Sequence, residues 1–583
     1  MKDACCVETE TESTYARGWT PQDIDMKDPK VDVEVLDTTL RDGAQTSGVS
    51  FTLQEKLSIT KKLDELGVSY VEGGWPGSNP KDVSYFKEAK RLPLENTEVV
   101  AFGSTKRSGV SCKNDSNLRS LLESEVRTAV IFGKSWTLHV KEVLKISPEE
   151  NLDCVRETIE HLRDHGIETI FDAEHFFDGY KSDKEYALSV LKAAEKGGAK
   201  VLVLADTNGG TLCHELVDIV RDVKKSVTKP LGIHAHNDSG LAVANTLMAV
   251  MEGVKHVQVT ANGLGERCGN ADLMQVVPAL ELKLRLKALK GPDESRLKLL
   301  VGFSKYIYDI LNMPPDPYQP YVGSKAFAHK GGVHVDAVLK TRSSYEHIDP
   351  ALVGNRRELL VSELAGRAAV MNEALKLGME LEKQSETVSK TLEEVKALES
   401  RGNLLESADA TIHMILYRNL GIKTSFFEVP HWMVMSRKHE SLQTEGQVVV
   451  RSGGDVLYAR AEGVGPVHAV DLSLRKALLT RFPTLGDVVL SNYKVTVVEG
   501  VKGTASFVRV LIEFSDGNKR WATTYTSDNI LEASAQALIE GYNYKLLSDS
   551  LNHGEKGRPG VGILTPEHDQ SSKHEEMGRT ERV

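Results

Sequence analysis

Short apolar runs rich in β-branched residues alternate with longer amphipathic segments over the first half of the chain. The apolar runs, which we predict to be strands, are residues 33–37, 68–73, 97–101, 128–132, 168–173, 199–205, 231–236 and 256–260. The intervening segments place apolar residues three and four positions apart, as helices do, and include 52–66, 148–165, 183–196, 211–225 and 241–252. Strands that alternate with helices in this way predict an α/β fold, a (β/α)₈ TIM barrel over residues 31–290. A doubly wound open sheet is the alternative, but no GxGxxG sequence follows the first strand.

The pattern changes after the barrel. Residues 298–312, 371–384 and 386–400 are predicted helices, and three prolines between Pro314 and Pro317 end the first of them. We therefore expect helical linker subdomains over residues 291–405. Strand-like runs follow at 426–436, 446–451, 455–462, 488–499, 506–514 and 519–525, with predicted helices at 466–480 and 529–547. Two successive units of strands and a helix predict an α+β domain over residues 406–550 with an internal duplication.

Composition describes an ordinary globular protein with polar ends. Apolar residues make up 40% and charged residues 27% of the 583 residues. The polar segments 1–30 and 551–583 are predicted to be disordered tails. No apolar run reaches the roughly 18 residues of a membrane span, and no basic stretch leads into an apolar one at the amino terminus. We therefore expect a cytoplasmic protein that does not contact membranes.

The charge and the cysteines exclude further classes. The chain has 72 basic and 83 acidic residues, a net charge of −11, which argues against general nucleic-acid binding. A local basic pocket for a phosphorylated cofactor remains compatible with this charge. The six cysteines show no paired zinc spacing, so we expect reduced thiols.

Polar, titratable residues follow several predicted strands at the end where a (β/α)₈ barrel performs chemistry. They are Arg41 and Asp42 after the first strand, Glu72 at the end of the second, Glu174 after the fifth, Thr207 after the sixth, His234 and His236 in the seventh, and Asn270 beyond the eighth. The carboxyl ends of the strands therefore form the predicted active site.

His234 and His236 are the most specific sign of a metal. Residues two apart in a strand point to the same face, so both imidazoles can enter the barrel mouth. Together with a carboxylate from Asp42 they would form a usual shell for Mg²⁺, Mn²⁺ or Zn²⁺. Arg41, next to Asp42, could neutralise a developing oxyanion. The alternatives are a charged surface turn and two structural histidines.

Several stretches resemble known enzymes. The sequences DTTLRDG at residues 37–43, HAHND at 234–238 and GERCGN at 265–270 resemble the DRE-TIM metallolyase superfamily. Within it, the chain is similar to the acyl-CoA Claisen-condensing synthases, which include isopropylmalate, homocitrate and citramalate synthases. The stretches 72–82, 132–140 and 174–180 are most similar to the citramalate synthases. The resemblance covers residues 31–549.

This resemblance implies roles for single residues. Asp42, His234 and His236 would bind the metal, with Asn270 in or near its shell. Arg41 would face the keto-acid carbonyl oxygen, and Thr207 would bind the substrate carboxylate. Glu72 is also predicted to contact substrate.

Three further residues are implied to act on protons. Glu174 would lie between the two substrates and help to hold or relay a proton. His334 and Tyr345 would come from the partner subunit of a homodimer, with His334 as the best candidate for the base and Tyr345 assisting it.

The implied reaction condenses acetyl-CoA with pyruvate and water to (R)-citramalate and CoA. The last domain resembles the regulatory dimerisation domain of these synthases, which binds the end product of the pathway, here isoleucine. Isopropylmalate synthase and homocitrate synthase are the alternatives, and hydroxymethylglutaryl-CoA lyase, which breaks the corresponding bond, lacks such a domain. A non-catalytic amino-acid or acyl-CoA sensor is the alternative from another class.

Overall fold

A computed structural model describes residues 31–291, 294–362, 366–438, 441–498 and 505–552. The predicted tails, 1–30 and the residues after 552, lie outside these ranges. The described chain forms two units. The first contains the residues up to Phe327 together with Ile348–Arg356, and the second contains Ala328–His347 and the residues from Arg357 onwards.

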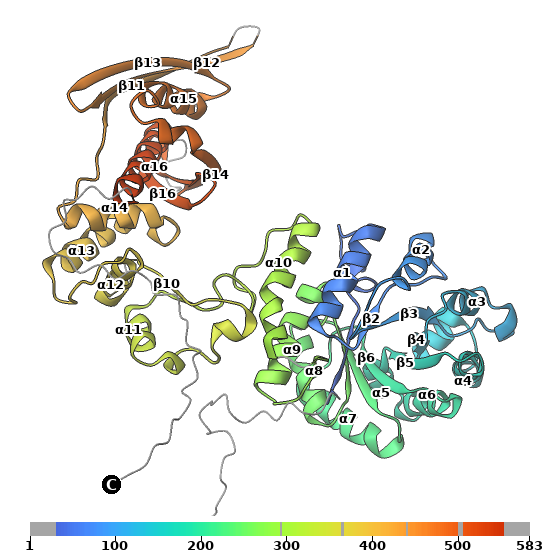
Figure 1. Ribbon diagram of the computed structural model, residues 1–583. Coiled ribbons are helices and arrows are strands. Elements are labelled where there is room, and N and C mark those ends of the chain that lie inside the picture. The colour runs from blue at the N-terminus through green and yellow to red at the C-terminus, as the bar shows by residue number, and fades with distance from the viewer. Residues whose placement is uncertain (1–30, 292–293, 363–365, 439–440, 499–504, 553–583) are drawn as a thin grey trace, which may run out of the picture. The chain divides into compact units, whose positions relative to one another are not determined.

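The first unit is built on a closed barrel of parallel strands (Figure 1). Strand β1 pairs with both β2 and β8, which closes the barrel. In the described residues the strands are β1 (Glu34–Asp37), β2 (Tyr70–Glu72), β3 (Glu98–Ser104), β4 (Thr128–Lys134), β5 (Glu168–Glu174), β6 (Val201–Asp206), β7 (Leu231–Ala235) and β8 (His256–Val259). The helices are α1 (Leu53–Leu66), α2 (Pro80–Ala89), α3 (Ser116–Glu123), α4 (Pro148–Asp164), α5 (Phe176–Ser182), α6 (Lys184–Gly197), α7 (Cys213–Ser226), α8 (Ala242–Met251), α9 (Leu273–Leu282) and α10 (Leu300–Ile310). The predicted TIM barrel is confirmed.

Local sequence signals explain where these elements begin and end. The Thr52 hydroxyl accepts from the backbone of Glu55, whose carboxylate accepts from the backbone of Thr52, which forms a capping box at the start of α1. Gly67 ends the helix with a φ of +93°, a conformation that glycine adopts without strain. The chain then enters β2, whose carboxyl end reaches the same rim as that of β1.

Apolar side chains make up much of the barrel interior. Val130, Ile170 and Val203 belong to a buried cluster contributed by several strands. Every residue of β6 is buried, which fits the continuous apolar runs expected of parallel strands covered on both faces. Because the interior is packed, the functional groups gather at the carboxyl rim.

The second unit is mainly helical in its first part and contains two antiparallel sheets in its second part. In its described residues β9 (Ala328–His329) pairs with β10 (Glu358–Leu359), and the helices are α11 (Gly332–Lys340), α12 (Arg367–Lys376), α13 (Glu386–Ser400) and α14 (Asp409–Asn419). One sheet joins β11 (Glu428–Lys438), β12 (Leu442–Ser452) and β13 (Asp455–Gly463) and is followed by α15 (Pro466–Leu478). The other joins β14 (Val489–Val497), β15 (Val508–Ser515) and β16 (Arg520–Ser527) and is followed by α16 (Ile530–Asn552). This repeat matches the duplication expected from the sequence.

One prediction in this unit was wrong, and one helix was not predicted. The predicted helix 371–384 is α12, which begins at Arg367 and ends at Lys376, because Gly378 with a φ of +74° closes its last turn. Helix α14 was not predicted, because it is buried along most of its length and therefore lacks a polar face with helical periodicity. No helix in the described part of the chain combines the length and apolarity that a membrane crossing requires.

Candidate active site

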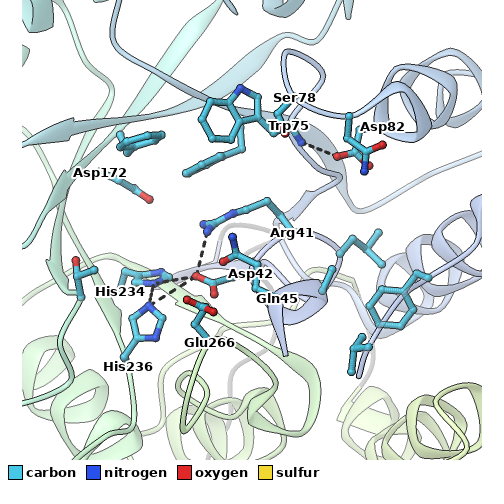
Figure 2. Close-up of a pocket in the computed structure, with 18 of the residues that line it drawn as sticks. Arg41, Asp42, Gln45, Trp75, Ser78, Asp82, Asp172, His234, His236 and Glu266 are labelled. Atoms are coloured by element: carbon cyan, nitrogen blue, oxygen red, sulfur yellow. Dashed lines mark hydrogen bonds and ion pairs between the residues drawn. The ribbon is translucent and has the colours of Figure 1, made fainter. Parts of the chain in front are cut away.

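A tight turn after β1 carries Arg41 and Asp42 into the barrel mouth. The backbone N–H groups of Arg41 and Asp42 both donate to the carbonyl oxygen of Thr38, at 3.1 and 2.9 Å. The Thr38 hydroxyl accepts a further bond from the backbone of Asp42, at 3.2 Å. The turn therefore holds both side chains at the rim of the barrel (Figure 2).

Arg41 is held between two carboxylates and an aromatic ring. Its Nε donates to Oε2 of Glu72 at 2.6 Å, and its Nη1 donates to Oδ2 of Asp42 at 3.0 Å. The centre of the guanidinium lies 3.9 Å from the centroid of the Phe102 ring. Burial lowers the pKa of Arg41, but Glu72 and Asp42 outweigh this effect and raise it, so the group stays charged.

Glu72 lies behind Arg41. Its side chain is fully buried, and its Oε2 also accepts from the Thr38 hydroxyl at 2.5 Å. Glu72 does not line the cavity described below. The geometry therefore favours a role in holding Arg41 over the predicted contact with substrate.

Asp42, His234 and His236 meet at one point. The Nε2 atoms of the two histidines lie 3.2 Å apart. Oδ2 of Asp42 lies 3.4 Å from Nε2 of His234 and 3.8 Å from Nε2 of His236. Burial raises the pKa of Asp42, but Arg41 and the two histidines outweigh it and hold that pKa far below its usual range. Burial, and then His234, lowers the pKa of His236 to about 3.

These residues fit a divalent metal. Metal ligands about 2.1 Å from an ion lie about 3.0–3.4 Å from one another, close to the separations observed here. An ionised carboxylate and a neutral imidazole are the forms that bind metals. Oδ1 of Asp42, which is buried, makes no hydrogen bond among the described residues.

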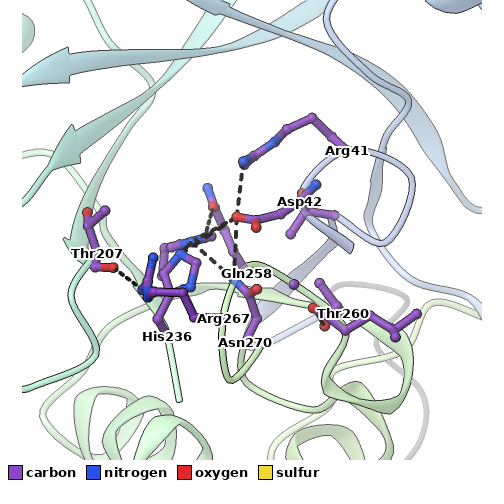
Figure 3. A network of polar contacts seen from close by, with 12 residues as sticks. Arg41, Asp42, Thr207, His236, Gln258, Thr260, Arg267 and Asn270 are labelled. Carbon is purple, nitrogen blue, oxygen red and sulfur yellow. Dashed lines mark hydrogen bonds and ion pairs between the residues drawn. The ribbon is translucent and has the colours of Figure 1, made fainter. Parts of the chain in front are cut away.

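Asn270 adjoins this group. His236 and Asn270 form an isolated β-bridge, which brings the loop after β8 against the end of β7. The Nδ2 atom of Asn270 lies 3.2 Å from Nε2 of His234 and 3.5 Å from Oδ2 of Asp42 (Figure 3). Oδ1 of Asn270 is buried and makes no hydrogen bond among the described residues, and the place of Asn270 in or near the metal shell stays a prediction.

Glu174 and Thr207 lie at the ends of β5 and β6. Glu174 forms an ion pair with Lys134. The backbone N–H of His175 donates to the Thr207 hydroxyl at 2.8 Å. His175 has a φ of +58°, so this turn is strained. Because the hydroxyl accepts this bond, its own hydrogen is available to a substrate.

An aromatic wall made of Trp75, Phe102 and Phe132 faces the same space. Trp75 meets each phenylalanine edge-on, and the phenylalanine rings stack with centroids 5.2 Å apart. The indole N–H of Trp75 donates to Oδ1 of Asn117 at 2.6 Å, which fixes the ring. Phe102 also contacts Arg41, so the aromatic wall borders the guanidinium that is expected to face the keto carbonyl of the substrate.

A cavity of about 540 Å³ joins these groups. Most predicted barrel residues line it, namely Arg41, Asp42, Glu174, Thr207, His234 and His236. Its wall also contains Asp172 and Glu266, to which the sequence analysis assigned no role. The missed signal was the strand period, because Asp172 and Glu174 share a face of β5 just as the two histidines share one of β7.

His334 and Tyr345 belong to the second unit. His334 lies on α11 and is exposed, and its ring stacks on that of Tyr345 with centroids 4.1 Å apart. The two predicted partners are thus adjacent to each other. Their catalytic role stays a prediction.

The comparisons with known proteins agree along the chain. Residues 32–297 match the HMGL-like family, residues 321–403 the homocitrate synthase post-HMGL domain-like family, and residues 406–546 the LeuA allosteric (dimerisation) domain. An (R)-citramalate synthase of Sulfolobus acidocaldarius is 49% identical over 90% of this chain and 98% of that protein. The chain belongs to the citramalate synthase family. The predicted resemblance to condensing acyltransferases is confirmed.

Two further relatives differ in their sequence identity to the chain. An (R)-citramalate synthase of Geobacter sulfurreducens is 46% identical over 90% of this chain and 99% of that protein. A probable 2-isopropylmalate synthase of Methanopyrus kandleri is 33% identical over 88% of this chain and 98% of that protein. The citramalate synthases named here thus share more identical residues with the chain than this isopropylmalate synthase does.

Proposed function

We propose that the chain condenses the acetyl group of acetyl-CoA with pyruvate and releases (R)-citramalate and CoA. The observation that carries the proposal is the aromatic wall of Trp75, Phe102 and Phe132, which closes the cavity beside Arg41. Pyruvate carries only a methyl group on its keto carbon, whereas the substrate of an isopropylmalate synthase carries a branched one. Large, fixed rings at this place favour the smaller substrate.

The residues divide the work of binding the keto acid. The Thr207 hydroxyl donates to the carboxylate of pyruvate, and Arg41 faces its carbonyl oxygen. Asp42, His234 and His236 hold a divalent cation, Mg²⁺, Mn²⁺ or Zn²⁺, which when bound polarises the carbonyl. Glu72 keeps Arg41 in place through its bond of 2.6 Å.

The bond-forming step needs a proton to leave the acetyl methyl group. His334, assisted by Tyr345 and supplied by the partner subunit, accepts this proton, and Glu174 helps to hold or relay it. The carbanion attacks C2 of pyruvate and forms the carbon–carbon bond, while Arg41 stabilises the charge that develops on the carbonyl oxygen. That oxygen then takes a proton, and water hydrolyses the thioester to leave the new carboxylate and the CoA thiol.

The last domain supports regulation of this reaction in a homodimer. Residues 406–546 match an allosteric dimerisation domain, and isoleucine is the effector that we propose for it. Titration of isoleucine against the full chain, and against a chain that ends near Gly402, tests this assignment. Equal responses of the two proteins would remove the regulatory role.

A panel of keto acids tests the proposed function. The purified protein is incubated with acetyl-CoA and either pyruvate, 3-methyl-2-oxobutanoate or 2-oxoglutarate, and release of free thiol is followed. We expect the highest kcat/KM with pyruvate. A higher value with the branched acid would assign the chain to the isopropylmalate reaction, and a higher value with the dicarboxylic acid to the homocitrate reaction.

A further inference from the structure

Gln258 joins His234 to Asp172 deep in the barrel. Its Oε1 lies 2.8 Å from Nδ1 of His234, and its Nε2 donates to Oδ1 of Asp172 at 2.8 Å. All three side chains are at least nine-tenths buried, and they come from β8, β7 and β5 (Figure 3 labels Gln258). The mechanism above uses neither Gln258 nor Asp172.

The direction of these bonds determines which nitrogen of His234 carries its proton. An amide nitrogen only donates, so Asp172 accepts and the amide oxygen of Gln258 faces His234. An amide oxygen only accepts, so Nδ1 of His234 must carry the hydrogen. In a neutral imidazole the other nitrogen, Nε2, then presents its lone pair.

Asn270 leads to the same tautomer from the other side of the ring. Its Nδ2 lies 3.2 Å from Nε2 of His234, and an amide nitrogen can only donate to it. Nε2 of His234 is therefore an acceptor. Two amides on separate segments of the chain thus agree on the hydrogen at Nδ1 and the lone pair at Nε2.

His236 has no such support. Its Nδ1 is buried and makes no hydrogen bond among the described residues. Of the two histidines, His234 is the one whose orientation and tautomer are fixed before a cation arrives.

We propose that Gln258 and Asp172 are positioning residues that keep His234 in its metal-binding tautomer, with Nε2 directed at Asp42 and His236. Oε1 of Gln258 accepts a hydrogen bond from the proton-bearing Nδ1 of His234. Asp172 accepts a hydrogen bond from Nε2 of Gln258 and so prevents the amide from flipping. This inference rests on the proposed function only in taking Asp42, His234 and His236 as the metal site. Loss of an outer partner of this kind typically weakens metal binding about 10–100-fold.

The test measures Mn²⁺ affinity of the metal-stripped full chain by electron paramagnetic resonance of the free ion. Gln258→Leu removes the acceptor, and we expect its Kd to rise about 10–100-fold. Gln258→Glu keeps an acceptor for Nδ1 and should bind Mn²⁺ at least about 10-fold more tightly than Gln258→Leu. Asp172→Leu frees the amide to turn over and should weaken binding at least about threefold.

Asn245→Leu is the matched control. In the wild type, Nδ2 of the buried Asn245 donates to the carbonyl oxygen of Thr211 at 2.8 Å and contacts none of Asp42, His234 and His236. This variant should keep the wild-type affinity. Equal losses of Mn²⁺ affinity in Gln258→Leu and Gln258→Glu would overturn the proposal, and so would wild-type affinity in Gln258→Leu. Wild-type affinity in Asp172→Leu would remove Asp172 from the proposal. Mn²⁺ binding that survives His236→Ala would instead contradict the metal site itself.

Discussion

Nε of Arg41 donates to Oε2 of Glu72 across 2.6 Å, and Glu72 is fully buried behind it. This bond fixes the guanidinium beside the expected keto carbonyl. Glu72→Gln replaces a hydrogen bond between two charged groups by one between a charged and a neutral group. A hydrogen bond to a charged group contributes about 1.5–3 kcal/mol, which is the most that this variant can lose. We expect kcat to fall about 10–100-fold, with little change in the amount of folded protein.

Glu168→Gln is the control for this change. Glu168 begins the fifth barrel strand, at the opposite end from the site, and pairs with Lys200 at 2.7 Å. Its variant should keep wild-type kcat. Steady-state kinetics with pyruvate provide the measurement, and a Glu72→Gln enzyme as fast as the wild type would show that Arg41 needs no anchor.

His236→Ala should abolish metal retention and turnover together. The variant removes one of the three ligands, and polarisation of the carbonyl is worth several kcal/mol, so we expect a loss of at least about 100-fold in kcat. Metal content after dialysis and initial rates are measured on the same sample. His214→Ala, at an exposed position on α7, should change neither quantity. Normal activity in His236→Ala would end the metal account.

Trp75→Leu should widen the choice of keto acid. The indole is held by Asn117 and completes the wall against Phe102 and Phe132. Removal of the ring makes room for longer side chains, and one methylene in such a pocket is worth about 1–3 kcal/mol. We expect the ratio of kcat/KM for 2-oxobutanoate to that for pyruvate to rise about 10-fold.

Trp136→Leu is the comparison for this pocket. Trp136 stacks on His139 and does not line the cavity. Its variant should keep the wild-type ratio. An equal change in both variants would mean that the selectivity reflects general loosening of the barrel.

Glu540 predicts a pH dependence of stability in the second unit. Burial raises the pKa of Glu540 from 4.5 to about 7, and the Thr411 hydroxyl donates to its Oε2 at 2.6 Å. A carboxyl group with a raised pKa in the folded state contributes stability that is full below pH 4.5 and is lost as pH rises through 7. Glu540→Gln, which stays neutral, should therefore be more stable than the wild type at pH 8, by about 1–3 kcal/mol.

Chemical denaturation at pH 5 and pH 8 measures this effect. The difference in unfolding free energy between variant and wild type should be larger at pH 8. The same difference at both values would mean that Glu540 ionises as it does in the unfolded chain.

The barrel strands were readable from the sequence because parallel strands buried on both faces need unbroken apolar runs. His234 and His236 were readable because their spacing matches the strand period, and Asp42 because it follows the first strand. The hydrogen bond between Gln258 and Asp172 could not be predicted from the sequence, because it joins β8 to β5 across the barrel and depends on their mutual register. The role of Glu72 behind Arg41 likewise depends on side-chain packing, which position along a strand does not specify.

The most direct test of the central claim is the amount of citramalate that the purified full chain forms from acetyl-CoA and pyruvate, measured by mass spectrometry. The reaction is run with metal-stripped protein, before and after Mn²⁺ is restored, and with His236→Ala in parallel. The account predicts citramalate, in amounts equal to the CoA released, only when wild-type protein and Mn²⁺ are both present. CoA release without citramalate, or citramalate from the His236→Ala protein at the wild-type rate, would contradict it.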